Sequence, residues 1–240
     1  MNYEYEYKYK KYKLKYDKLK NIMKGGVIEI DKQISIVKLI VMENLEYFMD
    51  LCKLDYEVGG FFDIKKRKYK KTNQGSIKSY RIEGMTLYPF YQMMKIDWHT
   101  HQDGEPEIYD EDGKKVKLDH PWISATPSGT DYGTHSGATI HYKKTIDKEE
   151  IVISCIISIK GLYFYWMQDE LSKFLLLQDN EELQEIIYEY LVPNLDNDMF
   201  QGAKNNSIEN IQELTKKSFT TPDISCGFNS IFIPIENLQK

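Results

Sequence analysis

Two kinds of hydrophobic pattern alternate in the N-terminal half of the chain. From Val37 onward, apolar residues recur every three or four positions, which predicts a helix over residues 37–52 with one apolar face. Before and after it lie short apolar runs of strand length bounded by polar residues or glycine. Short strands are therefore predicted at residues 27–30, 34–36, 58–64 and 93–99.

The C-terminal half repeats this mixture. Residues 151–159 form a continuous β-branched run, typical of a buried strand, and Lys160-Gly161 turns it into a second strand over residues 162–166. Helices are predicted at residues 169–178 and 181–191, with Asp179 or Asn180 as the N-cap and Pro193 as the end. After Pro193 the sequence is polar, with a possible helix at 208–217 and a late strand at 231–235. Strands and helices interleaved in this way predict an α/β fold.

Residues 102–126 read as an insertion between two strand-and-turn segments. Asp112-Gly113 lies between the strand-like runs 107–109 and 115–118, and this dipeptide is a strong signal for a hairpin. Such a hairpin returns the chain close to where it left. Its acidic tip (Asp110, Glu111, Asp112) is either a contact for a basic substrate surface or plain surface decoration.

Two segments are strongly basic. Residues 1–26 alternate tyrosine with lysine and glutamate, a pattern that fits a poorly ordered tail, an added edge strand, or an arm that docks on a partner. Residues 65–71 are almost entirely lysine and arginine, which is more often a solvated turn than a partner-binding patch.

Composition places the 240-residue chain among ordinary globular proteins, with 41% hydrophobic and 29% charged residues. The net charge of −5 argues against general nucleic-acid binding. No apolar run is long enough to span a membrane, and the N-terminus is too polar for a secretory signal. Three scattered cysteines (Cys52, Cys155, Cys226) indicate free thiols in a reducing compartment. We therefore expect an intracellular, cytoplasmic protein, with a nuclear location as the alternative.

The candidate chemistry centres on His99-Thr100-His101. Side chains at i and i+2 of a strand point to one face, so these two imidazoles can lie side by side, as a metal requires. Catalytic zinc takes three protein ligands and keeps one position for water. Asp131 supplies a carboxylate after the turn at Pro127-Ser128, and Glu57 supplies another at the start of an apolar run. Asp119 and His120 in the insertion are an alternative source of the third ligand, and His135 and His141 also compete.

This ordered set resembles a known family. Glu57, then His99-x-His101, then Ser128-x-x-Asp131 resembles the JAMM motif of the MPN+ (JAB) zinc metalloproteases, which include deubiquitinases and enzymes that act on ubiquitin-like sulfur carriers. Trp98 before the first histidine also fits. Residues 102–127 between His101 and Ser128 are a longer spacing than the family usually has. The resemblance covers roughly residues 34–166.

The resemblance implies a fold, a metal and roles for the residues. The fold would be that of the MPN domain, which is cytidine-deaminase-like, with a mixed, mostly antiparallel sheet flanked by helices. His99, His101 and Asp131 would hold one Zn²⁺ per chain, Glu57 would act as general acid and base, and Ser128 would donate to the oxyanion. Residues 27–192 would form the catalytic domain, with residues 1–26 as an N-terminal arm and residues 193–240 as a C-terminal extension.

The implied function is hydrolysis of ubiquitin or ubiquitin-like conjugates, with an MPN-type partner subunit also possible. Two alternatives stay open: a non-catalytic MPN scaffold, and a JAB-type peptidase that processes another ubiquitin-like or sulfur-carrier protein. The chain lacks the His-x-Glu and Pro-Cys-x-x-Cys motifs of zinc deaminases and the His-Glu-x-x-His motif of helical zinc proteases.

Overall fold

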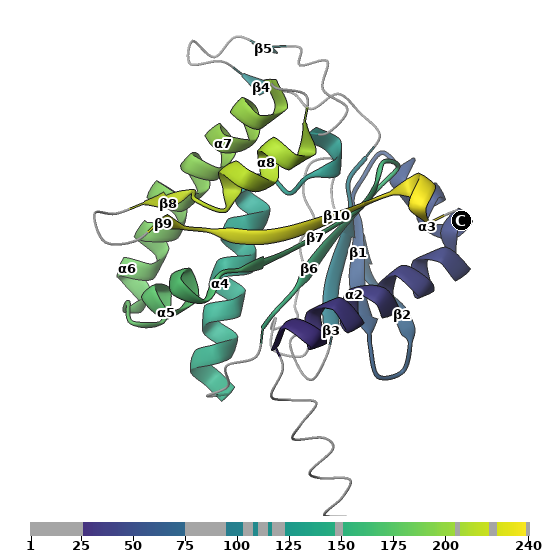
Figure 1. The fold of residues 1–240 in the computed structure, drawn as a ribbon, viewed down its shortest axis with the longest axis horizontal. Coiled ribbons are helices and arrows are strands. Elements are labelled where there is room, and N and C mark those ends of the chain that lie inside the picture. Colours follow the sequence, from purple (N-terminus) through teal and green to yellow (C-terminus); the bar gives the residue numbers. More distant parts are fainter. Residues whose placement is uncertain are drawn as a thin grey trace, which may run out of the picture.

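A six-stranded mixed sheet with helices on both faces forms the centre of the computed structural model (Figure 1). The strand order is β10-β7-β6-β3-β1-β2, and every neighbouring pair is antiparallel except β3 and β6. The predicted α/β class with a mostly antiparallel sheet is therefore confirmed. The structure describes residues 26–74, 95–102, 108–109, 115–116, 123–146, 151–204, 207–220 and 225–238.

The sheet and the helices that flank it are built from the following elements. The strands of the sheet are β1 (Val58–Asp63), β2 (Lys68–Gln74), β3 (Lys95–Thr100), β6 (Ser154–Ser158), β7 (Gly161–Met167) and β10 (Phe228–Pro234). The helices are α2 (Gly26–Glu43), α3 (Leu45–Cys52), α4 (Gly129–Ile146), α5 (Asp169–Leu176), α6 (Asn180–Glu185), α7 (Val192–Lys204) and α8 (Ile208–Thr215). Shorter pieces are β4 (Ile108–Tyr109), β5 (Lys115–Val116), β8 (Phe219–Thr220), β9 (Ser225–Cys226), two 3₁₀ turns, η1 (Ile123–Ala125) and η3 (Ile235–Asn237), and the π-helix η2 (Ile186–Leu191).

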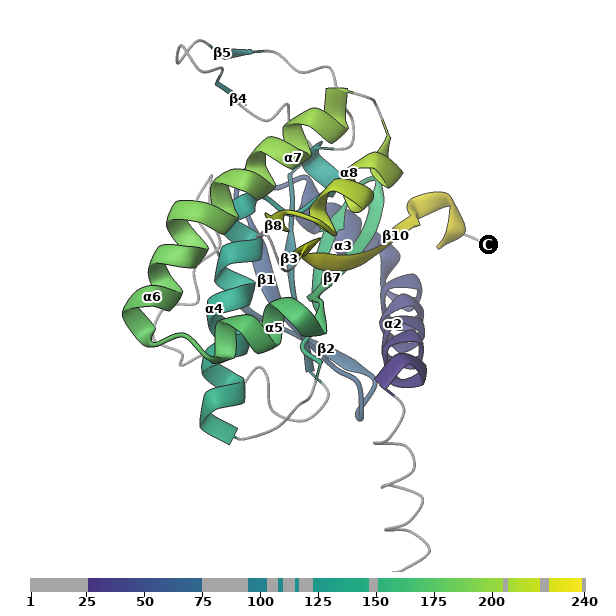
Figure 2. The same cartoon turned by 60° about the vertical axis from the view of Figure 1, so that its left-hand side comes forward.

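Alternation along the strands divides the interior into two cores. Cys155 and Ile157 of β6 face α2 and α3, whereas Ile156 faces α4 and the later helices. In β7, Phe164 packs in the core on the side of α2 and α3, and Tyr165 packs in the core on the side of α4. Figures 1 and 2 show α2 and α3 on one side of the sheet and α4 to α8 on the other. The buried apolar run predicted at residues 151–159 is therefore covered on both faces.

The strands predicted at residues 27–30 and 34–36 are wrong, because both runs belong to helix α2. Ile30, Ile34 and Val37 are three or four residues apart and all buried, so the helical face predicted from Val37 begins earlier. The single helix predicted over residues 37–52 is divided at Asn44 into α2 and α3. Both pack their buried residues on the same core.

The predicted end of a helix at Pro193 is also wrong. The chain passes from α6 through the π-helix and continues as α7 to Lys204. The π-helix closes with Val192 N–H donating to Ile187 O, five residues back. Pro193 cannot donate a backbone hydrogen bond, and it lies in the first turn of α7, where the hydrogen-bond register changes.

Other predictions are confirmed. Asp179 caps α6 in a capping box with Glu182. The predicted hairpin exists as the antiparallel pair β4 and β5, whereas its acidic tip at residues 110–112 lies outside the described residues. The basic run at residues 65–71 forms an exposed turn and the start of edge strand β2.

The segment after residue 192 is built into the same structure. It contributes the edge strand β10, which pairs with β7 over its whole length, and buries Leu195, Ile211 and Phe228 in the core under α4. The basic segment 1–26 lies outside the described residues, apart from its last residue. Across the part of the chain that is described, no helix combines the length and the apolar character that crossing a membrane requires.

Candidate metal centre

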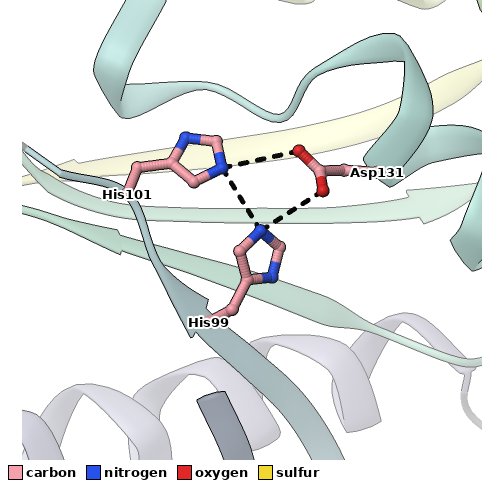
Figure 3. A group of neighbouring side chains, drawn as sticks. All are labelled: His99, His101 and Asp131. Carbon is pink, nitrogen blue, oxygen red and sulfur yellow. Dashed lines mark hydrogen bonds and ion pairs between the residues drawn. The ribbon is translucent and has the colours of Figure 1, made fainter. Parts of the chain in front are cut away.

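The two histidines lie at the end of β3, where the strand leaves the sheet. Trp98 is fully buried on the face toward α2 and α3, so His99 points to the opposite face. His101 follows the strand, and its backbone N–H still donates to Ile157 O at 2.9 Å, which extends the pairing with β6. The two imidazoles therefore share one face, and their Nε2 atoms are 3.2 Å apart (Figure 3).

Asp131 reaches the same point from the first turn of α4. Its Oδ1 lies 3.4 Å from His99 Nε2 and its Oδ2 lies 3.4 Å from His101 Nε2. Asp131 therefore lies beside the histidines although residues 102–127 separate His101 from Ser128 in the sequence. The structure brings His99, His101 and Asp131 together as a group that could hold a metal ion.

Ser128 immediately precedes α4 as its N-cap and fixes the position of Asp131. The Ser128 hydroxyl accepts from the Asp131 N–H at 3.2 Å, while the Asp131 carboxylate accepts from the Ser128 N–H at 2.7 Å. This reciprocal pair is a capping box in which aspartate takes the place of the usual glutamate. The Ser128 Oγ–H also donates to Asp131 Oδ2 at 2.8 Å. The cap therefore orients the carboxylate toward the imidazoles.

The electrostatics of the group favour an ionised Asp131. Burial by itself raises the pKa of Asp131, but the two imidazoles outweigh it and hold that pKa well below its usual range. For His99, burial lowers the pKa, and the carboxylates of Asp131, Glu57 and Asp97 together raise it above the ordinary value. The negative charge that a divalent cation needs is thus present before any metal binds.

The distances fit a metal ion. Bonds of 2.0–2.1 Å in a tetrahedral site imply ligand–ligand separations of roughly 3.3–3.4 Å. The two Nε2 atoms are 3.2 Å apart, and each lies 3.4 Å from an Asp131 oxygen, His99 from Oδ1 and His101 from Oδ2, so the spacing is of this order. Two neutral imidazoles and a carboxylate are also the donors that zinc and related transition metals prefer.

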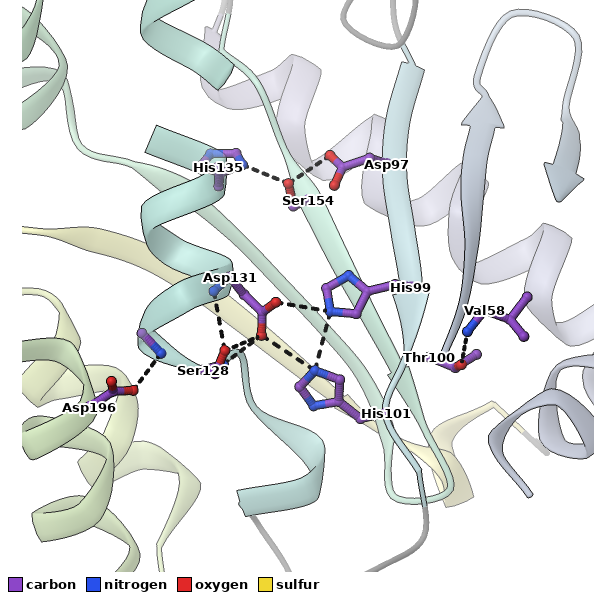
Figure 4. A network of polar contacts seen from close by, with 11 residues as sticks. Val58, Asp97, His99, Thr100, His101, Ser128, Asp131, His135, Ser154 and Asp196 are labelled. Carbon is purple, nitrogen blue, oxygen red and sulfur yellow. Dashed lines mark hydrogen bonds and ion pairs between the residues drawn. The ribbon is translucent and has the colours of Figure 1, made fainter. Parts of the chain in front are cut away.

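Glu57 stands beside this group. It immediately precedes β1, whose Gly59 is paired with His99, and the Val58 N–H donates to Thr100 Oγ1 at 3.0 Å (Figure 4). Glu57 is half-buried, and its charge contributes to the raised pKa of His99. Among the residues that the structure describes, no hydrogen bond or ion pair of the Glu57 carboxylate is found.

The competing histidines have other positions. His135, on α4, is buried, and its Nδ1 lies 2.6 Å from Ser154 Oγ, which in turn donates to Asp97 Oδ1 at 2.7 Å (Figure 4). His141 is exposed on the same helix. His120 and Asp119 lie outside the described residues. His135 is thus part of a buried polar chain and not of the group that could hold a metal ion.

One residue that contacts the start of α4 was not predicted from the sequence. Asp196 of α7 accepts from the Gly129 N–H at 2.7 Å and thereby holds the start of α4. It follows Pro193, where the sequence pattern suggested that the helix had ended, so no signal connected it with Asp131.

Comparisons with protein-family models, with curated proteins and with solved structures return no match for this chain.

Proposed function

We propose that this chain is a zinc-dependent isopeptidase that hydrolyses ubiquitin or ubiquitin-like conjugates. The observation that carries the proposal is the group of His99, His101 and Asp131, with the half-buried Glu57 close enough for its charge to raise the pKa of His99. The order of these residues along the chain and the α/β fold agree with the resemblance to JAMM metalloproteases. The MPN fold itself is part of the proposal.

Zinc is the proposed metal because the donor set suits it and because the motif resembles that of JAMM zinc metalloproteases. Two histidines and one carboxylate also bind iron(II) in six-coordinate sites. Ligands at 90° with similar bond lengths would be roughly 3.0 Å apart. The observed separations of 3.2–3.4 Å, two of which run to different oxygens of Asp131, do not distinguish these geometries, so the choice of zinc rests on the resemblance.

Each residue of the site has its own role in the proposed hydrolysis. Zinc held by His99, His101 and Asp131 would supply Lewis acidity, which makes water a nucleophile near neutral pH. Glu57 takes a proton from the attacking water as the C–O bond forms and returns it to the leaving lysine amine as the C–N bond breaks. Ser128 turns its hydroxyl from Asp131 to the oxyanion that develops on the carbonyl. Asp131 stays ionised throughout.

Cleavage assays test this proposal. Incubating the purified protein with diubiquitins and with fusions of several ubiquitin-like proteins should give cleavage by the parent. Glu57→Gln should abolish cleavage and keep the zinc, because Glu57 is not a ligand. Glu46→Gln, which changes an exposed acid on α3, is the control and should cleave as the parent does. Equal cleavage by parent and Glu57→Gln would refute the role of Glu57.

The alternatives give different results. Cleavage of non-ubiquitin fusions alone would identify a peptidase for another ubiquitin-like or sulfur-carrier protein. Zinc binding with no cleavage of any substrate would support a scaffold that uses the metal for structure.

A further inference from the structure

The N-terminus of α4 is held from two directions. Ser128 and Asp131 close the capping box from within the chain segment itself. From α7, more than 60 positions later in the chain, Asp196 Oδ1 accepts from the Gly129 N–H at 2.7 Å. Figure 4 shows Asp196 on one side of this turn and the two histidines on the other. Asp131 therefore lies between its cap and the imidazoles.

The approach of α7 to this turn is close. A Cβ atom on Gly129 would come within 2.6 Å of both Asp196 Oδ1 and Val192 O. One turn later, a Cβ on Gly133 would come within 2.6 Å of Val192 Cγ2. Only glycine allows this contact without a shift of either helix. The first two turns of α4 are thus seated directly on α7.

The two aspartates at this helix start have separate tasks. Partial removal from water raises the pKa of Asp196, the Gly129 N–H lowers it, and the charge of Asp131 raises it further. Although Asp196 is exposed as a residue, its Oδ1 is directed at the backbone of α4. Because Asp196 takes up the Gly129 N–H, the Asp131 carboxylate is left to Ser128 and to the histidines.

From this geometry we infer that Asp196 is a positioning residue for the metal centre. Its acceptor oxygen fixes the first turn of α4 and so the direction of Asp131, the third ligand. The C-terminal segment beginning with α7 is on this account part of the metal site without contributing a ligand. The inference rests on the proposed metal-binding function and goes beyond it.

Zinc affinity of the full chain, measured by competition with a chromophoric chelator, tests the inference. Loss of a group that orients a metal ligand typically weakens binding about 10- to 100-fold, so Asp196→Ala should bind zinc at least about 10-fold more weakly. Asp196→Asn keeps an acceptor oxygen and should stay close to the parent. Asn197→Ala, an exposed change on the same turn of α7, is the matched control.

Two further measurements separate positioning from general destabilisation. The visible absorption spectrum of the cobalt(II)-substituted protein should change in Asp196→Ala and not in Asn197→Ala, at equal thermal unfolding midpoints of the metal-free proteins. Gly129→Ala displaces the same contact from the other side and should also weaken zinc binding. Because the two changes disrupt one contact, the loss in the double variant should be smaller than the product of the single losses.

Several outcomes would overturn the inference. These are parental zinc affinity and cobalt spectrum in Asp196→Ala, equal weakening in Asp196→Asn and Asp196→Ala, or independent effects of the Gly129 and Asp196 changes. If Asp196→Ala does not fold, Gly129→Ala and Asp196→Asn decide the question. A parent that binds no zinc, or an Asp131→Ala variant that keeps it, would instead defeat the proposed function.

Discussion

The buried chain of Asp97, Ser154 and His135 predicts an unusual dependence of stability on pH. His135 is 3% exposed and packs against Tyr165 and Phe228, so its charged form is disfavoured. Burial, with a smaller effect of the Lys143 charge, lowers its pKa from 6.5 to about 3. The perturbation that isolates this group is His135→Asn, because asparagine removes the titration and can still form a hydrogen bond.

The magnitude follows from the two pKa values. Below pH 6.5 the unfolded chain binds a proton at His135 that the folded protein refuses until about pH 3, so stability falls as the pH is lowered through this window. Between pH 7 and pH 5.5 the loss from this one group is about 1.2 kcal/mol. Asp97 acts in the opposite direction, because burial raises its pKa to about 6 and its contribution is lost as the pH rises through that value.

Urea unfolding of the metal-free parent and variant at pH 7.0 and 5.5 measures the effect. Lowering the pH should cost the parent about 1.2 kcal/mol more unfolding free energy than it costs His135→Asn. His141→Asn removes an exposed histidine from the same helix and serves as the control; its pH dependence should match that of the parent. Parallel pH dependences of the parent and His135→Asn would refute the assignment of His135 as a neutral buried group.

Three further predictions concern the surroundings of the site. Gly60→Ala places a Cβ 1.9 Å from Lys70 O in the bulge of β1, and should lower the free energy of unfolding by about 1–3 kcal/mol in urea titrations. Gly137→Ala, where the added Cβ has room, should instead stabilise α4 by up to about 1 kcal/mol. Ser128→Ala removes the cap and should cost about 1 kcal/mol of stability and about 10-fold in zinc affinity; unchanged affinity would contradict the orienting role of the cap. Zinc binding should weaken from pH 7.5 to pH 6.0, because the raised pKa of His99 makes zinc displace a proton there; an affinity independent of pH would contradict this.

Hydrophobic spacing predicted the elements whose burial is apolar. The runs at residues 58–64 and 151–159 contain strands β1 and β6, whose apolar residues are buried in the core, those of β6 on both faces of the sheet. The same method failed at residues 27–36. There the spacing of the apolar residues fits both one helix and two short strands separated by Asp31 and Lys32. The helix is the arrangement that forms, because it buries both Ile30 and Ile34 on the face that packs against the sheet.

Helix α4 had no such signal, because much of its buried face is polar. His135, Ser136 and Thr139 are all less than 5% exposed and form side-chain hydrogen bonds. Only Ser128-x-x-Asp131, the capping box, marked the start of this helix in the sequence. The sequence did predict that His99 and His101 lie side by side, because of strand alternation, whereas Asp131 as the third member followed from the resemblance to the JAMM motif.

The sequence pattern did not predict contacts between segments that are distant in the chain. The hydrogen bond from Gly129 to Asp196 depends on the π-helix carrying the chain past Pro193, and no local propensity predicts that register change. The activity, the zinc identity and the MPN family remain predictions that rest on the resemblance and on the geometry of the site.

The most direct test of the central claim is the zinc content of the purified chain beside Asp131→Ala and His101→Ala. We predict about one zinc per parent chain and little in either variant, because the three side chains share one ion. Zinc retained in Asp131→Ala would contradict the ligand set. A parent that binds no zinc, even after reconstitution, would contradict the metal centre as a whole.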